Sequence, residues 1–138
     1  MEIRLIDTNI LFEYYSQSTL FRLCEELLNM QVLVIKEVLT ELYNLLKNKR
    51  GVNDAIKVIE TIMRDEDRYK VIWETAECYP RALEICRKYQ FKYPNKDYSL
   101  VDGIQLAFLE DFKNVTLFTT DARMKLFKGG KVNIPFQV

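Results

Sequence analysis

The most restrictive feature of this sequence is the regular alternation of short apolar runs with longer segments of helical periodicity. The clearest run, residues 32–35, contains four consecutive apolar β-forming residues, which is typical of a strand buried on both faces. Similar runs cover residues 3–6, 69–73 and 115–119. Strands separated by helices predict a parallel sheet covered on both faces, and right-handed crossovers leave few topologies for it.

The segments between these runs carry apolar residues at the spacing of helices. Thr75 is a candidate cap for the helix expected over residues 75–89, and Pro80 lies in the early part of that helix. Pro135 follows the last expected strand, residues 132–134, and suits an edge position in the sheet. Helices are expected over residues 8–15, 20–28, 38–50, 52–63, 75–89, 99–112 and 122–127, a loop over 91–97, and a last short strand over 132–134. We therefore predict one domain over residues 1–138, with a three-layer α/β/α, Rossmann-like fold and a mostly parallel sheet of four to five strands in the order 3-2-1-4-5.

Composition excludes several classes of function. The chain has no histidine, which removes Ser-His-Asp triads and most zinc sites. Apolar residues make up 49% of the 138 residues, so a real core is expected and disorder is not. Twenty basic and 20 acidic residues give a net charge of zero. Any contact with nucleic acid must therefore come from a local basic patch.

The three cysteines, Cys24, Cys78 and Cys86, lie in helix-like segments without a CxxC pair. We interpret them as reduced core residues of a cytoplasmic protein. Glu2, Arg4 and Asp7 interrupt the N-terminus, so no signal peptide is expected, and no run of about 18 apolar residues predicts a membrane span.

Four acidic residues from distant parts of the sequence are predicted to meet at one edge of the sheet. Asp7 follows the first strand and Asp121 follows the fourth, and in the predicted order these strands are neighbours. Their carboxyl ends form the crevice in which ligands bind in such sheets. Glu41 lies in the first or second turn of the helix after the second strand, and Asp102 in the first turn of the helix before the fourth. Both helices begin at that same edge.

Each of these acids has a structural explanation by itself. Ser99 and Asp102 have the spacing of a capping box, Asp7 and Asp121 can cap the helices that follow them, and Glu41 can be solvated. Together they are harder to explain, because clustered carboxylates repel and raise one another's pKa. A counter-charge such as Mg²⁺ or Mn²⁺ removes the difficulty, since both ions prefer oxygen ligands. Metal-assisted hydrolysis of a phosphodiester needs no histidine.

With these acids in place, the chain resembles the PIN domain family, and most closely the VapC-type ribonuclease toxins of toxin–antitoxin operons. The resemblance covers nearly the whole chain in length and element order. The first and fourth motifs are fairly specific together, whereas the middle two alone are weak. The motifs are Leu5-Ile6-Asp7-Thr8-Asn9-Ile10-Leu11, Val38-Leu39-Thr40-Glu41-Leu42, Leu100-Val101-Asp102-Gly103-Ile104 and Leu117-Phe118-Thr119-Thr120-Asp121.

The resemblance implies a metal-dependent endoribonuclease that uses Mg²⁺ or Mn²⁺, often dimeric and often restrained by an antitoxin. Asp7, Glu41, Asp102 and Asp121 would be its catalytic and metal-binding residues. Asn9 and a hydroxyl such as that of Thr120 would support them, Glu37 can assist or replace Glu41 from one helical turn earlier, and Asp97 lies near Asp102. The sequence departs from the family where Lys36 replaces a small hydroxyl residue and Gly103 replaces a commoner alanine, which can loosen the first turn of that helix.

Basic residues near the third and fourth motifs are candidate contacts for RNA phosphates. They are Lys96, Arg123 and Lys125, with Lys128 beside them, and an ordinary solvated helix face is the alternative. The apolar faces over residues 20–28 and 52–63 can serve the core, a homodimer or an antitoxin helix. The alternatives to a toxin ribonuclease are a PIN-type nuclease of RNA processing or DNA metabolism and a non-catalytic PIN scaffold. A signalling receiver domain fits poorly, because it requires paired acids after the first strand.

Overall fold

The computed structural model describes residues 2–95 and 98–135. It contains a sheet in which every neighbouring pair of strands is parallel, as predicted. The strand order β3-β2-β1-β4-β5 is also the predicted one. The strands are β1 (Ile3–Ile6), β2 (Val32–Ile35), β3 (Tyr69–Ile72), β4 (Val115–Phe118) and β5 (Lys131–Asn133).

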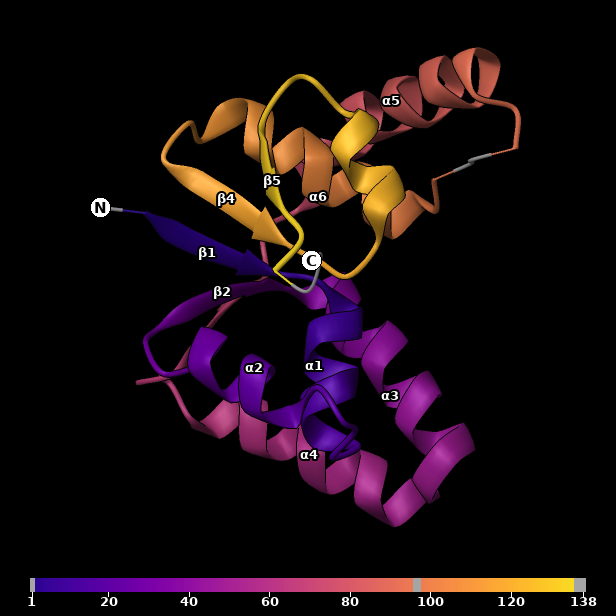
Figure 1. The fold of residues 1–138 in the computed structure, drawn as a ribbon. Coiled ribbons are helices and arrows are strands. Elements are labelled where there is room, and N and C mark those ends of the chain that lie inside the picture. The colour runs from indigo at the N-terminus through magenta and orange to yellow at the C-terminus, as the bar shows by residue number, and fades with distance from the viewer. Residues whose placement is uncertain (1, 96–97, 136–138) are drawn as a thin grey trace.

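Helices cover the two faces of this sheet, with the N-terminal helices on one face and the C-terminal ones on the other (Figure 1). The first group is α1 (Thr8–Tyr15), α2 (Phe21–Leu27), α3 (Lys36–Arg50) and α4 (Val52–Arg64), and the second is α5 (Tyr79–Lys92) and α6 (Leu100–Asp111). Two short 3-10 helices, η1 (Ala76–Cys78) and η2 (Ala122–Leu126), precede α5 and follow β4. The three-layer α/β/α prediction is therefore confirmed.

Three local predictions differ from the structure. Thr75 makes no capping hydrogen bond, because its hydroxyl donates to Glu37 instead. Helix α5 begins only at Tyr79, with Pro80 in its first turn, and it continues to Lys92 into the segment expected to be a loop. The last helical segment is the 3-10 helix η2 rather than an α-helix. Lys96 and Asp97 lie outside the described residues.

The core lies between the sheet and its helices. Leu5 and Ile6 of β1 are fully buried, and all four residues of β4 are buried. Helix α6 is buried over seven consecutive residues from Gly103 to Leu109, directly after the turn that carries Asp102. Cys24 belongs to this core, whereas Cys78 and Cys86 are partly buried, and all three thiols are free. No helix in residues 2–95 and 98–135 is long and apolar enough to cross a membrane.

Candidate active site

The reversal of strand order between β1 and β4 brings the ends of the first and fourth motifs together. Ile6 pairs with Phe118 at the last register position of the two strands. The Asp7 backbone N–H then donates to the Phe118 carbonyl at 3.0 Å. The residues that follow each strand therefore leave the sheet side by side, as expected for a switch point.

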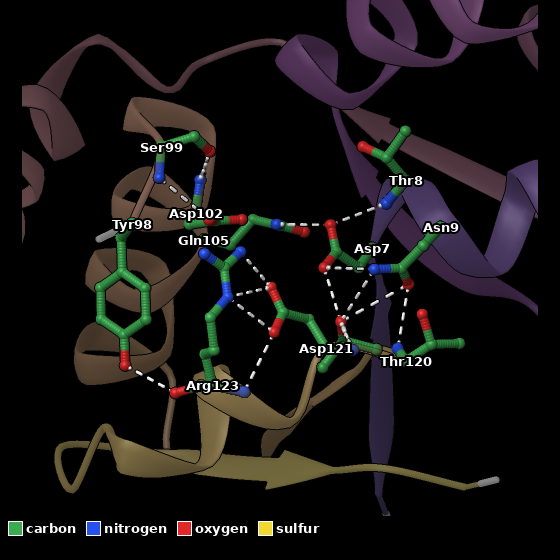
Figure 2. Close-up of polar contacts among 11 residues, drawn as sticks. Asp7, Thr8, Asn9, Tyr98, Ser99, Asp102, Gln105, Thr120, Asp121 and Arg123 are labelled. Atoms are coloured by element: carbon green, nitrogen blue, oxygen red, sulfur yellow. Dashed lines mark hydrogen bonds and ion pairs between the residues drawn. The ribbon is translucent and has the colours of Figure 1, made fainter. Parts of the chain in front are cut away.

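Asp7 is a buried carboxylate that is hydrogen-bonded on both oxygens (Figure 2). Its Oδ1 accepts from the Thr8 backbone N–H at 2.7 Å and from Gln105 Nε2 at 3.0 Å. Its Oδ2 accepts from the Thr119 hydroxyl at 2.7 Å and from Asn9 Nδ2 at 3.5 Å. Burial raises the pKa of Asp7, these hydrogen bonds oppose that rise, and the charge of Asp121 adds to it. Asp7 thus has a fixed orientation and an unfavourable environment for its charge.

Two of these partners, Thr119 and Gln105, were not among the predicted site residues. The hydroxyl that contacts Asp7 belongs to Thr119 rather than Thr120, and it also accepts from the Asp121 backbone N–H at 3.0 Å. Thr120 contributes its backbone N–H to Asn9 Oδ1 at 3.0 Å. Gln105 is fully buried in the otherwise apolar middle of α6, and this polar interruption is the one signal that the sequence offers for it.

Glu41 approaches Asp7 from the second turn of α3. Its Oε1 accepts from the Thr8 hydroxyl at 2.6 Å, so Thr8 contacts both acids. Burial raises the pKa of Glu41, the Thr8 hydrogen bond opposes the rise, and the charge of Asp7 adds to it. Glu37 faces a different pocket, where its Oε2 accepts from the hydroxyls of Thr75 and Tyr79 at 2.7 and 2.6 Å. The structure therefore brings Glu41, and not Glu37, to the other acids.

Asp102 forms the predicted capping box of α6. The Ser99 hydroxyl accepts from the Asp102 backbone N–H at 3.1 Å, and Asp102 Oδ2 accepts from the Ser99 backbone N–H at 3.0 Å. Burial and then the charge of Asp7 raise the pKa of Asp102 to about 6, against the hydrogen bonds from Ser99. The cap and the site are compatible, since the cap holds the carboxylate at the edge where the other acids lie.

This raised pKa predicts a measurable effect on stability. Because the folded pKa of Asp102 is about 6 and its ordinary value is 3.8, the folded state binds more protons than the unfolded state between these values. The free energy of unfolding of the ion-free protein therefore falls as pH rises through this window. Asp102→Asn keeps an acceptor for the Ser99 N–H and removes the charge. We expect it to raise the free energy of unfolding at pH 7 by about 1–3 kcal/mol in EDTA, as measured by urea unfolding.

The gain from Asp102→Asn should shrink when the same measurement is made at pH 4, where Asp102 is largely protonated. Asp67→Asn, at an exposed carboxylate in the turn before β3, is the matched control and should change stability little at either pH. A gain in stability that is independent of pH, or no gain at pH 7, would contradict the raised pKa of Asp102.

Asp121 differs from the other three acids because it is paired with a guanidinium. Its Oδ1 accepts from the Arg123 backbone N–H at 3.0 Å and from Arg123 Nε at 2.9 Å. Its Oδ2 accepts from Nε at 3.0 Å and from Nη2 of the same residue. Burial acts to raise the pKa of Asp121, but these contacts outweigh it and hold the pKa below its ordinary value.

All four acids line one pocket of about 560 Å³. Among the described residues that line it, Arg123 is the one with a positive charge. Gln105 Oε1, beside Asp7, is buried without a hydrogen-bond partner among the described residues. An excess of negative charge and oxygen donors fits a hard divalent cation such as Mg²⁺ or Mn²⁺. Within residues 2–95 and 98–135, however, no three of these carboxylates lie close enough together to hold a metal ion as they stand.

The candidate phosphate-binding residues are placed differently from one another. Arg123 lines the pocket and is engaged with Asp121. Lys125 is exposed on η2 and is not among the lining residues. Lys96 and the candidate acid Asp97 lie outside the described residues. A positively charged approach to the pocket therefore stays a prediction for Lys96 and Lys125.

Comparisons with known proteins give the same fold. A model of the PIN domain family matches residues 4–129. No curated protein sequence matches the chain. Among solved structures, the Mycobacterium tuberculosis toxin VapC20, described as cleaving the sarcin-ricin loop, is similar with a TM-score of 0.71 and 17% identity, over 89% of this chain and 93% of that one.

Two toxin–antitoxin structures are also similar. One is a toxin–antitoxin complex from Klebsiella pneumoniae, with a TM-score of 0.68 and 18% identity over 98% of this chain and 99% of that chain. The other is VapBC2 from Rickettsia felis bound to a DNA fragment of its promoter, with a TM-score of 0.67 and 18% identity over 95% and 97%. At these identities the likeness concerns the fold, and the chemistry has to be argued from the site.

Proposed function

The chain belongs to the PIN domain family, and from this premise we propose that it is a metal-dependent endoribonuclease and the toxin of a toxin–antitoxin pair. Residues 1–138 would form a single domain with one active site. The observation that carries the proposal is the convergence of Asp7, Glu41, Asp102 and Asp121, which come from four separate elements and line one pocket.

The four acids would hold one or more Mg²⁺ or Mn²⁺ ions. When bound, such an ion supplies positive charge beside the phosphoryl oxygens of an RNA substrate. Asp7 is the anchor of the set, since hydrogen bonds to both oxygens hold it in one orientation. Thr8 positions Glu41 relative to Asp7 through its hydroxyl.

Asn9 ties the two strand ends together. Its Oδ1 accepts from the Thr120 N–H, while its Nδ2 donates to Asp7 and to the Thr119 hydroxyl. The segment that carries Asp121 is thereby held against Asp7. In this proposal Asn9 and Thr119 are positioning residues, and the acids are the residues that bind the ion.

The proposed partners follow from the neighbouring structures and from the site. Two of those structures are toxin–antitoxin assemblies, which supports a protein antitoxin as partner. The VapC20 toxin is described as cleaving the sarcin-ricin loop, which supports a structured RNA as substrate. A homodimer is part of the same proposal, with the apolar faces of α2 and α4 as its candidate surfaces.

The direct test is incubation of end-labelled structured RNA with the purified protein in Mg²⁺ or Mn²⁺ and in EDTA. Internal cleavage that requires the ion supports the proposal. A folded protein that neither cleaves RNA nor binds Mn²⁺ by calorimetry contradicts it. Cleavage that is equally fast in EDTA would contradict the metal dependence.

Glu41 and Glu37 form a matched pair for the same assay. We expect Glu41→Gln to weaken Mn²⁺ binding and slow cleavage by about 10- to 100-fold, because it removes a carboxylate of the pocket but keeps the Thr8 hydrogen bond. Glu37 lies one helical turn before Glu41 and lines another pocket, so Glu37→Gln should leave Mn²⁺ binding and the rate of RNA cleavage nearly unchanged. The reverse ranking would show that Glu37 is the functional acid.

A further inference from the structure

We propose that Arg123 is an exchangeable counter-charge of Asp121, which occupies that carboxylate in the ion-free protein and must leave it before Asp121 joins a bound divalent ion. The inference rests on the proposed function and deepens its ion site. It makes Arg123 a positioning residue whose contact with Asp121 competes with metal binding.

The contact between the two residues engages both oxygens of the carboxylate, with the single Nε–H of Arg123 shared between them. An ionised carboxylate offers about four acceptor positions. In Asp121, Oδ1 accepts from the Arg123 backbone N–H and from Nε, while Oδ2 accepts from Nε and Nη2. All four contacts come from one residue (Figure 2). An ion that takes an oxygen of Asp121 therefore competes with the Arg123 side chain for it.

The burial of the pair allows such an exchange. The Arg123 side chain is 42% exposed and that of Asp121 is 20% exposed, so the guanidinium lies nearer to solvent than the carboxylate does. The Arg123 backbone is fixed meanwhile, because its carbonyl accepts from the hydroxyl of Tyr98 at 2.9 Å and the next residue, Met124, is fully buried. The side chain can swing while its Cα stays beside the pocket.

The exchange also accounts for the arrangement of the acids. Asp121 is the one acid of the four that is bound to a guanidinium, and no three acids within the described ranges are gathered into an ion-ready group. A divalent cation offers more charge than the guanidinium it replaces, so repulsion from Asp7 and Asp102 favours the exchange. The displaced guanidinium stays within the pocket mouth, where a substrate phosphate can take it up as a bidentate partner.

A role for Arg123 in holding Asp121 in place predicts the opposite change in ion affinity from a role as competitor. If Arg123 only holds Asp121 in its productive position, its removal should weaken ion binding. If Arg123 competes with the ion, its removal should strengthen binding, because the ion no longer displaces a partner and the pocket carries one more uncompensated negative charge. The sign of the change in affinity therefore separates the two roles.

The experiment is a calorimetric Mn²⁺ titration of the full chain and four variants, Arg123→Gln, Arg123→Lys, Arg87→Gln and Asp7→Asn. We expect Arg123→Gln to bind Mn²⁺ about tenfold more tightly than the wild type, which is the scale of one charge-assisted pair. Arg123→Lys keeps the charge but loses the planar guanidinium, so its Mn²⁺ affinity should lie between those of the wild type and Arg123→Gln. Arg87→Gln removes one exposed arginine of α5 that does not line the pocket, and it should match the wild type.

The outcomes distinguish this inference from the proposed function. Wild-type binding that Asp7→Asn abolishes, with no tighter binding by Arg123→Gln or Arg123→Lys, overturns the exchange and leaves the ion site standing. No binding by the wild type or either Arg123 variant overturns both. A second readout is the KM for RNA, which should rise in Arg123→Gln although the ion binds more tightly, because the phosphate loses its guanidinium partner.

Discussion

Asp7→Asn is expected to reduce metal-dependent RNA cleavage by at least about 100-fold, the largest effect of any single substitution in the site. Asp7 is the acid nearest the centre of the hydrogen-bond network and the one whose charge raises the pKa of both Glu41 and Asp102. Its replacement by a neutral amide removes the charge of a proposed ion ligand whose two oxygens are held in one orientation by hydrogen bonds.

The fold should survive this substitution. An asparagine can place its carbonyl oxygen where Oδ1 accepts from Thr8 and Gln105, and its amide where the Thr119 hydroxyl can act as acceptor. Since a buried charge disappears, the ion-free variant should be at least as stable as the wild type. The rate of RNA cleavage measures activity, Mn²⁺ calorimetry measures ion affinity, and the urea midpoint measures stability, so the three effects of Asp7→Asn can be separated.

Asp67→Asn provides the control for Asp7→Asn, because it removes one exposed carboxylate far along the chain from the four motifs. It should cleave and bind Mn²⁺ like the wild type. A folded Asp7→Asn protein that cleaves RNA at the wild-type rate would show that the four-carboxylate pocket is not the active site. An unfolded variant would instead show that Asp7 is needed for the structure.

Gly103→Ala is expected to lower the free energy of unfolding by about 1–3 kcal/mol, although alanine is the better helix former. The resemblance to the family suggested that glycine here loosens the first turn of the helix. The structure instead shows a close contact between α6 and α5. A Cβ on Gly103 would lie 2.9 Å from the Ala82 carbonyl oxygen and 2.8 Å from Cys86 Sγ. The backbone oxygen cannot rotate away, so the two helices must separate.

Urea unfolding measures this effect, and a double variant identifies its origin. Adding Cys86→Ala removes the sulfur contact but leaves the Ala82 carbonyl in place, so it should restore only part of the lost stability. Because Gly103 follows Asp102 directly, a shift of α6 should also slow RNA cleavage. A higher urea midpoint for Gly103→Ala would mean that α5 and α6 tolerate the methyl group and that helix propensity decides the sign.

Much of the architecture was predictable because it depends on local periodicity. Continuous apolar runs mark β2 and β4 as buried strands, and helical spacing marks the segments between the strands. Strand order and the parallel direction then follow from crossover handedness and from the resemblance to a known family. Misplaced ends, such as the late start of α5 at Tyr79, arise where a side chain has a tertiary partner, as Thr75 has in Glu37.

The sequence by itself placed Asp7, Asp102 and Asp121 at the edge of the sheet, because each follows a strand or begins a helix there, but it left Glu37 as an alternative to Glu41. Only the tertiary structure decided how they are held. Asp7 finds its partners Gln105 and Thr119 at 98 and 112 residues along the chain, and no local pattern encodes such a pairing. The choice of Thr119 over Thr120 depends on the register of β4 against β1, since neighbouring residues of an extended segment point to opposite sides. The engagement of Arg123 with Asp121 is by contrast local, because the two residues are two positions apart in the turn that begins η2, and it places the guanidinium on the acid that the family resemblance had assigned to the metal.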